Sequence, residues 1–169
     1  MHRIALWAAL LSLAACQAGV PLTLMPTETT PVLPPTADVQ SSIWLEQLFS
    51  SGRLAVYFYS ADDIPCVRFL VDLPAVQPVS ACATPQAAAV VAQGVVRDAE
   101  GQPYTIIAVR AVQPEVSVVV IELRNGESYP LEIEEGGALL ILPEIVQAWQ
   151  AVPIDSYGDT VGTLLRLSP

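Results

Sequence analysis

The stretch VSVVVIELR (116–124), NG (125–126), ESYPLEIE (127–134) decides the fold of this chain. Two apolar, largely alternating runs flank an Asn-Gly pair, and this arrangement is the strongest short-range signal of a β-hairpin. Asn125 and Gly126 both tolerate the positive φ angles that a two-residue type I′ turn requires. The stretch therefore predicts two antiparallel strands joined by a type I′ turn.

Similar patterns on both sides extend this hairpin to a whole β domain. Strands are expected over 54–59, 66–73, 90–97, 104–112, 138–142, 146–154 and 161–167, and turns or loops over 62–65, 74–83, 98–101, 136–137 and 155–159. Residues 85–94 are compatible with a short helix, but the strand from about Val90 is favoured. Turns that recur every eight to twelve residues predict an all-β fold, a single antiparallel β-sandwich or a partly open barrel.

One short helix is expected at the start of this domain, over residues 41–49. Its apolar residues, Trp44, Leu45, Leu48 and Phe49, share one face at helical spacing, a Ser precedes them, and Gly52 can end the helix. Such a helix would pack over one end of the domain or, alternatively, dock a partner. The succession of strand, Asn-Gly, strand, Gly-Gly, strand, Leu-Pro and strand resembles small immunoglobulin-like or carboxypeptidase-regulatory-like sandwiches in layout, without any shared functional residue.

The N-terminus has the organisation of a secretory signal. Arg3 is followed by an apolar run over 4–13 and by the small residues Ala14 and Ala15. The run is about ten residues long, whereas a membrane-spanning helix needs roughly 20. Leu13-Ala14-Ala15-Cys16 resembles the lipobox of bacterial lipoprotein precursors, although an ordinary secretory signal is the alternative. The resemblance implies cleavage before Cys16, lipid on its sulfur, and acylation of its new amino group.

Three parts follow from this organisation: a signal peptide (1–15), a lipid-anchored tether (16–41) and a β-sandwich domain (42–169). The tether carries Pro residues among Thr residues, a composition typical of a semi-rigid spacer. The expected location is the cell membrane, with the domain held by lipid on its extracytoplasmic face. Anchoring of this kind is stable when two or more acyl chains are present.

The composition excludes several functional classes. The sequence has seventeen acidic residues, seven basic residues that are all Arg, and one His, which is His2 in the signal peptide. Without His or Lys, the mature chain can form no Ser–His, Cys–His or Ser–Lys pair and no zinc site that contains His. The mature chain has a net charge close to −11 and no basic patch, so nucleic acid is not expected as a partner.

Cys66 and Cys82 remain as a pair once Cys16 is assigned to lipid. In an oxidising compartment an even pair predicts a disulfide, which would contribute roughly 3 kcal/mol for a loop of this length. Two free thiols, or two ligands of a shared metal, are the alternatives.

Carboxylates are the main remaining candidates for chemistry. Glu132 and Glu134 are two residues apart and so lie on one face of a predicted strand. They are candidates for half of an acid/base pair or for a cation site, and the alternative is a solvated sheet edge. Asp62 and Asp63 share a turn, where acids usually satisfy backbone donors. Asp155 and Asp159 flank a loop with Ser156 and are candidate Ca²⁺ ligands. No other cofactor is expected.

Four aromatic residues are candidates for a carbohydrate-binding face, with core packing as the alternative: Tyr57, Tyr59, Trp149 and Tyr157. Together these observations predict a lipid-anchored binding or assembly module without catalytic activity, with a protein or carbohydrate partner. The alternatives are a carboxylate-dependent, carbohydrate-active hydrolase and a Ca²⁺-stabilised adhesion domain.

Overall fold

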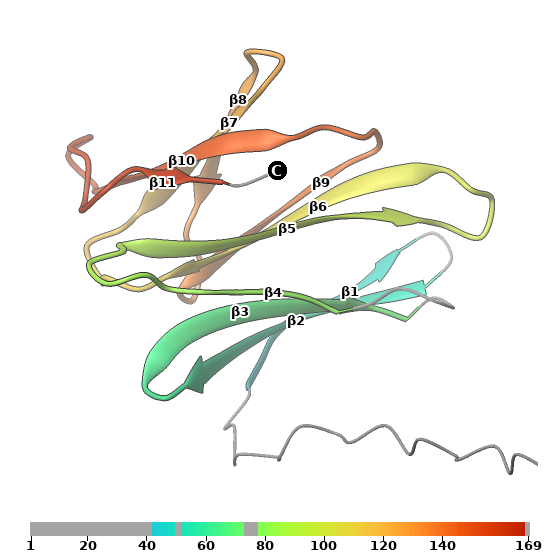
Figure 1. Ribbon diagram of the computed structural model, residues 1–169, viewed down its shortest axis with the longest axis horizontal. Helices are drawn as coiled ribbons and strands as arrows, with labels where there is room; N and C mark the ends of the chain where they lie inside the picture. The colour runs from blue at the N-terminus through green and yellow to red at the C-terminus, as the bar shows by residue number, and fades with distance from the viewer. Residues whose placement is uncertain (1–41, 50–51, 73–77, 168–169) are drawn as a thin grey trace, which may run out of the picture. The chain divides into compact units, whose positions relative to one another are not determined.

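The computed structural model describes residues 42–49, 52–72 and 78–167, and these residues form strands and no helix (Figure 1). The strands are β1 (Ser42–Phe49), β2 (Gly52–Ala61), β3 (Ile64–Val71), β4 (Val79–Cys82), β5 (Ala89–Arg97), β6 (Pro103–Ala111), β7 (Val118–Leu123), β8 (Ser128–Glu132), β9 (Gly137–Leu142), β10 (Ala148–Ile154) and β11 (Leu165–Arg166). Every strand pairing is antiparallel, which confirms the predicted all-β fold class. None of the described segments offers the long apolar helix that a bilayer crossing by a helix requires. The predicted signal peptide and tether lie outside the described residues.

The strands form three sheets, none of which closes into a barrel. We call them the N-sheet (order β1-β2-β3-β4), the central sheet (β5-β6-β9) and the C-sheet (β11-β10-β7-β8). Figure 1 shows the central sheet between the other two, with the N-sheet below it and the C-sheet above it. The predicted sandwich therefore has a third layer.

The central sheet is buried on both faces, and its middle strand, β6, is apolar without interruption from Ile106 to Val109. Residues Ile106 and Ala108 of β6 pack against the N-sheet, whereas Ile107 and Val109 pack against the C-sheet. All four have no exposed surface. Consecutive side chains of a strand point to opposite faces, so a run without polar residues is typical of a strand that is covered on both sides.

The first strand shows that the helix predicted over 41–49 is wrong. Residues 42–49 pair with β2, and the register shifts between Ile43 and Leu45. Such a bulge places two residues opposite one, and the consecutive Trp44 and Leu45 both pack on the core between the N-sheet and the central sheet. Leu48, by contrast, is 85% exposed. The bulge interrupts the strand alternation, and the resulting apolar spacing imitates a helix.

The Asn-Gly hairpin is present, but the predicted type I′ turn is not. Leu123 N–H donates to the carbonyl of Glu127 at 2.8 Å, which leaves a three-residue loop, 124–126. Gly126 has a φ of 91°, whereas Asn125 is not among the residues with positive φ. The Asn125 side chain instead accepts the N–H of Glu127 at 3.0 Å. Asn125 therefore stabilises this loop through its side chain and not through a left-handed backbone.

A two-residue turn with positive φ at both positions occurs at Asp62 and Asp63, whose φ angles are 50° and 64°. Their neighbours Ala61 and Ile64 are paired, so Ile64 and Pro65 already belong to β3, and the turn is narrower than the predicted 62–65. Asp tolerates this left-handed backbone better than most residues because its short polar side chain can bond locally.

The predicted disulfide is confirmed. Cys66 of β3 and Cys82 of β4 are direct cross-strand partners, and their sulfur atoms are bonded. Residues 79–82 form a strand, so the loop predicted over 74–83 is wrong for these four residues. The favoured hairpin around 98–101 is confirmed, and the alternative helix over 85–94 does not form. The final strand, predicted over 161–167, is reduced to Leu165–Arg166.

Candidate binding grooves along the edges of the central sheet

Two grooves run along the open edges of the central sheet. The β9 groove, about 500 Å³, is lined by Trp44, Leu45 and Gln47 of β1, by 130–132 of β8 with Glu134, and by 137–139 and 141 of β9. The β5 groove, about 390 Å³, is lined by 79–82 and 84, by 89–93 of β5, and by 165–167. Each groove thus has an edge strand of the central sheet as its floor and edge strands of the two outer sheets as its walls. Both volumes fall in the range of natural ligand sites.

The floor of the β9 groove carries backbone groups that point away from the sheet. In an antiparallel pair, successive residues direct their N–H and C=O groups alternately toward and away from the partner strand. Gly137 exchanges both of its groups with Glu134, at 3.0 and 2.9 Å, on the side away from β6. By alternation, Leu139 and Ile141 direct theirs the same way, into the groove that both residues line.

One wall of the β9 groove is fixed by close packing of Trp44. Its ring stacks on Phe58 with centroids 5.2 Å apart, and its indole N–H donates to the carbonyl of Glu134 at 3.3 Å. A Cβ atom added at Gly137 would lie 3.0 Å or less from atoms of both rings. Glycine at this position therefore lets Trp44 and Phe58 of the N-sheet approach the beginning of β9.

The predicted pair Glu132 and Glu134 lies in this groove. Both residues are exposed and both belong to the same wall, β8 and the turn that follows it. The opposite wall contributes Trp44, Leu45 and Gln47 and no acid. The two carboxylates therefore act as one negative patch and do not face each other across a cleft, as the acid and base of a glycosidase must.

The β5 groove has the opposite charge. Its lining includes Arg166 and no acid. Gln93 connects its floor to the C-sheet, because its side chain accepts the N–H of Ala148 at 3.1 Å and donates to the carbonyl of Val146 at 3.4 Å. The edge strand of this groove is therefore already tied to a neighbouring layer.

The candidate Ca²⁺ ligand Asp155 has a structural role in its loop. Its Oδ1 accepts the N–H groups of Tyr157 and Asp159, each at 2.9 Å. Asp98 does the same in the loop 98–102, where it accepts two backbone N–H groups at 3.0 and 2.8 Å. In the part of the chain that the structure describes, no three acid, Cys or His side chains come together as a metal site. Asp155 and Asp159 stay a predicted Ca²⁺ pair.

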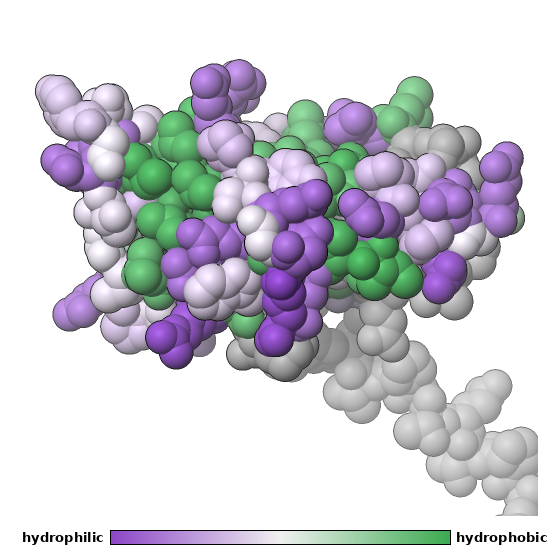
Figure 2. Space-filling model, turned by 90° about the horizontal axis from the view of Figure 1, so that it is seen from above, coloured by the Kyte–Doolittle hydropathy of each residue, from purple (hydrophilic) through white to green (hydrophobic). Residues whose placement is uncertain are grey.

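A second apolar surface lies on the outer face of the C-sheet. Val118 and Val120 of β7 pair with Ile154 and Val152 of β10, and all four are only partly buried. Figure 2, which looks onto the molecule from the side of the C-sheet, shows hydrophobic residues gathered in patches among polar ones. Polar neighbours interrupt this surface.

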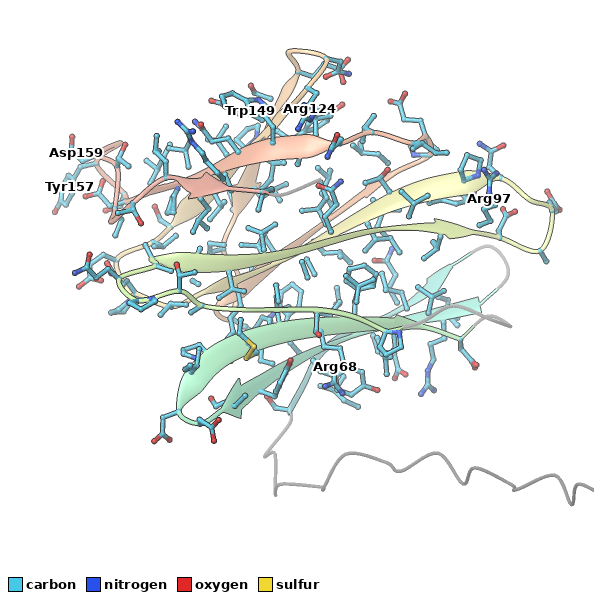
Figure 3. The ribbon with its side chains drawn as sticks, viewed as in Figure 1. Arg68, Arg97, Arg124, Trp149, Tyr157 and Asp159 are labelled. Atoms are coloured by element: carbon cyan, nitrogen blue, oxygen red, sulfur yellow. A yellow bond between two sulfur atoms is a disulfide. The ribbon has the colours of Figure 1, made fainter. Side chains whose placement is uncertain are left out.

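The four aromatic candidates do not form one carbohydrate-binding face. Tyr57 and Tyr59 lie on the N-sheet, where they line a hollow of about 230 Å³ with Arg68 and Leu70. The guanidinium carbon of Arg68 is 4.8 Å from the centre of the Tyr59 ring. Trp149 lies beside Arg124 on the C-sheet, and Tyr157 stands 89% exposed at a loop (Figure 3). The Tyr57–Tyr59 hollow alone brings two of the four together.

Sequence reasoning did not identify Arg110 as a structural residue. Its guanidinium donates to the carbonyls of Tyr59 and Cys66, at the turn end of the β2–β3 hairpin, and lies 5.3 Å from the Phe58 ring. Partial burial lowers the pKa of Arg110. The arginine thus joins the central sheet to the N-sheet. A charged residue inside the apolar run 104–112 was the signal that pointed to such a role.

No family model matches the chain, and neither a curated protein nor a solved structure matches it significantly. The function of the protein is therefore inferred from the geometry of its grooves.

Proposed function

We propose that this protein is a lipid-anchored, extracytoplasmic binding or assembly module and not an enzyme. The observation that carries this proposal is the β9 groove, in which outward-directed backbone groups of an edge strand lie between two walls. Exposed strand edges bind other extended chains through main-chain hydrogen bonds. The lipobox-like residues 13–16 and the disulfide support a location outside the cytoplasm.

The alternative of a carboxylate-dependent hydrolase has weaker support. Glu132 and Glu134 lie on one wall of their groove, and Asp155 is engaged in its own loop. Hydrolysis of a glycosidic bond needs an acid on each side of the bond. The described grooves offer no such opposed pair.

Two experiments test the proposal. Mass spectrometry of the N-terminal peptide from membranes should find Cys16 at the new N-terminus with diacylglyceryl and acyl groups, whereas a Cys16→Ser variant should stay unprocessed. An unmodified Cys16 in a soluble protein would remove the anchored part of the proposal.

The non-enzymatic part is tested by converting Glu132, Glu134, Asp155 and Asp159 to their amides. Purified wild type should release no more reducing ends from envelope polysaccharides than this fourfold variant does. Turnover by wild type that disappears in the variant would instead establish the hydrolase. The folded state of the variant is checked by its circular dichroism spectrum.

A further inference from the structure

The β9 strand differs from the other strand edges of the molecule. Native proteins protect open edges with Pro, charged residues, bulges or very short strands. Of the six strands at sheet edges in the described residues, five show such a device: Pro130 and Glu132 in β8, Glu46 and the bulge in β1, Arg97 in β5, four residues only in β4, and two with Arg166 in β11. The sequence of β9, GALLIL, has neither Pro nor charge nor bulge. A hydrophobic edge of this kind is expected to pair with another strand.

The groove above this edge fits an extended chain. A strand paired to β9 through Leu139 and Ile141 would become the fourth strand of the central sheet. Its alternate side chains would then face the two walls, Trp44 and Leu45 on the side of the N-sheet and Glu132 on the side of the C-sheet. The walls therefore favour apolar side chains at one parity of the bound strand and charged side chains at the other.

The charge of the groove identifies the sign of the ligand. Its lining contains Glu132 and Glu134 and no basic residue. The whole chain has a formal net charge of −10. A positively charged segment would be attracted both at a distance and in contact.

The same charges disfavour two other occupants of the groove. A second copy that paired β9 with β9 would bring the same two carboxylates of each copy together and would bury like charges. The chain's own tether, residues 17–40, contains Glu28 and Asp38 and neither Lys nor Arg. The tether therefore has no basic side chain that could pair with Glu132 or Glu134.

We infer that the β9 groove docks an extended, basic segment of a partner protein as an additional strand of the central sheet. This inference rests on the proposed binding function and specifies the surface and the chemistry of the partner.

The probe for this inference is an eight-residue peptide of alternating arginine and valine, fluorescently labelled, with blocked ends. Its binding to the detergent-solubilised mature protein is measured by fluorescence anisotropy up to about 1 mM peptide, a concentration that detects even weak association. Two further peptides serve as controls: one with glutamate in place of arginine, and one with arginine and valine in which alternate backbone amides are N-methylated. We expect saturable binding of the first peptide and at least tenfold weaker binding of the other two.

Variants assign the binding to the groove. The double variant Glu132→Gln and Glu134→Gln should bind the basic peptide with about tenfold lower affinity, because two negative charges close to the peptide are lost. Glu100→Gln with Glu115→Gln removes the same charge from exposed positions outside the groove and should change the affinity less than twofold. Equal effects of the two double variants, or equal binding of the acidic or the N-methylated peptide, would overturn the inference.

Other outcomes also decide it. No binding of any peptide up to the highest concentration overturns it. Self-association that competes with the peptide would assign the groove to a second copy, and binding that appears only after deletion of 17–40 would assign it to the tether. Either result overturns the inference of a basic partner. The lipid on Cys16 and the absence of hydrolysis are tested by separate experiments. Failure of the inference is thus distinguishable from failure of the proposed function.

Discussion

The two edges of the central sheet are built alike and yet differ in what they present. Both edge strands lie between walls that belong to the outer sheets, and both contain a glycine against which an aromatic ring of the N-sheet packs. At the β9 edge this glycine is Gly137, beside Phe58 and Trp44; at the β5 edge it is Gly94, beside Phe69. The β9 groove has two carboxylates and an apolar edge, whereas the β5 groove has Arg166 and an edge tied to the C-sheet by Gln93.

This difference indicates that, in a three-layer stack, the edges of the middle sheet can vary while its buried faces stay alike. The core is formed by both faces of the central sheet, which leaves its two edges free to differ in charge without a cost in packing. The edge with the fewest protective features is then the better candidate for a binding surface. If the two edges share one core and differ only at the grooves, substitutions in the core should affect both edges, whereas substitutions in one groove should affect only that groove.

The largest effect is expected from Ile107→Ala, which removes buried volume from β6 between the two edges. Ile107 has no exposed surface and packs on the C-sheet core. Truncation of such a residue leaves a cavity and should lower the free energy of unfolding by about 4 kcal/mol. Urea denaturation measures this loss of stability. The control is Val95→Ala, at a position that is 45% exposed, which should change the free energy of unfolding by no more than about 0.5 kcal/mol. Similar effects of both substitutions would contradict the buried central layer.

The next effect concerns one wall of the β5 groove, to which Cys82 belongs. Replacing Cys66 and Cys82 by Ser should lower stability by about 3 kcal/mol, since the unfolded chain then gains the freedom of an open loop. Thermal unfolding with and without a reductant measures it: the reductant should destabilise wild type and leave the double variant unchanged. Insensitivity of wild type would mean that the thiols are free. Under conditions in which the double variant is folded, it should bind the basic peptide in the β9 groove as wild type does.

Much of this architecture was predictable from sequence, because turn chemistry and alternation act locally. The hairpins around 98–101 and 125–126 follow from such local signals. The pairing of Cys66 with Cys82 was predicted differently, from the even number of cysteines that remains when Cys16 carries lipid. The errors have physical causes of the same kind. A bulge at Trp44 imitated a helix, and the side chain of Asn125 took over the role that its backbone was expected to play.

The two candidate grooves could not be predicted from the sequence, because they depend on how the sheets stack. The acids at 132 and 134 were identified as a pair, but their common wall with Pro130 and their position opposite Trp44 arise only when β1, β8 and β9 come together. No local signal specifies which strand of three sheets becomes an edge. The apolar, uncharged run 137–142 was the one available indication that β9 differs from other edges.

The two glycines provide a matched test of the comparison. Gly137→Ala and Gly94→Ala each place a Cβ within 3.0 Å of an aromatic ring of the N-sheet, so each should destabilise the protein by about 2 kcal/mol through overpacking. Only Gly137→Ala alters the β9 groove, and it should lower the affinity for the basic peptide more than tenfold. Equal loss of peptide affinity in Gly94→Ala would show that the effect comes from general destabilisation and not from the groove.

The smallest effect is expected at the two Asp-capped loops, which compare the candidate Ca²⁺ site with a loop of the same construction. Asp155→Asn and Asp98→Asn both keep an oxygen that can accept the two backbone N–H groups, so each should lower stability by no more than about 0.5 kcal/mol. If Asp155 acts only in its turn, 1 mM Ca²⁺ should shift the melting temperatures of wild type and both variants equally or not at all. A Ca²⁺-dependent rise in wild type and Asp98→Asn that is absent in Asp155→Asn would instead establish a metal site. It would favour the adhesion domain, because bound Ca²⁺ stabilises only the folded state that holds its ligands together.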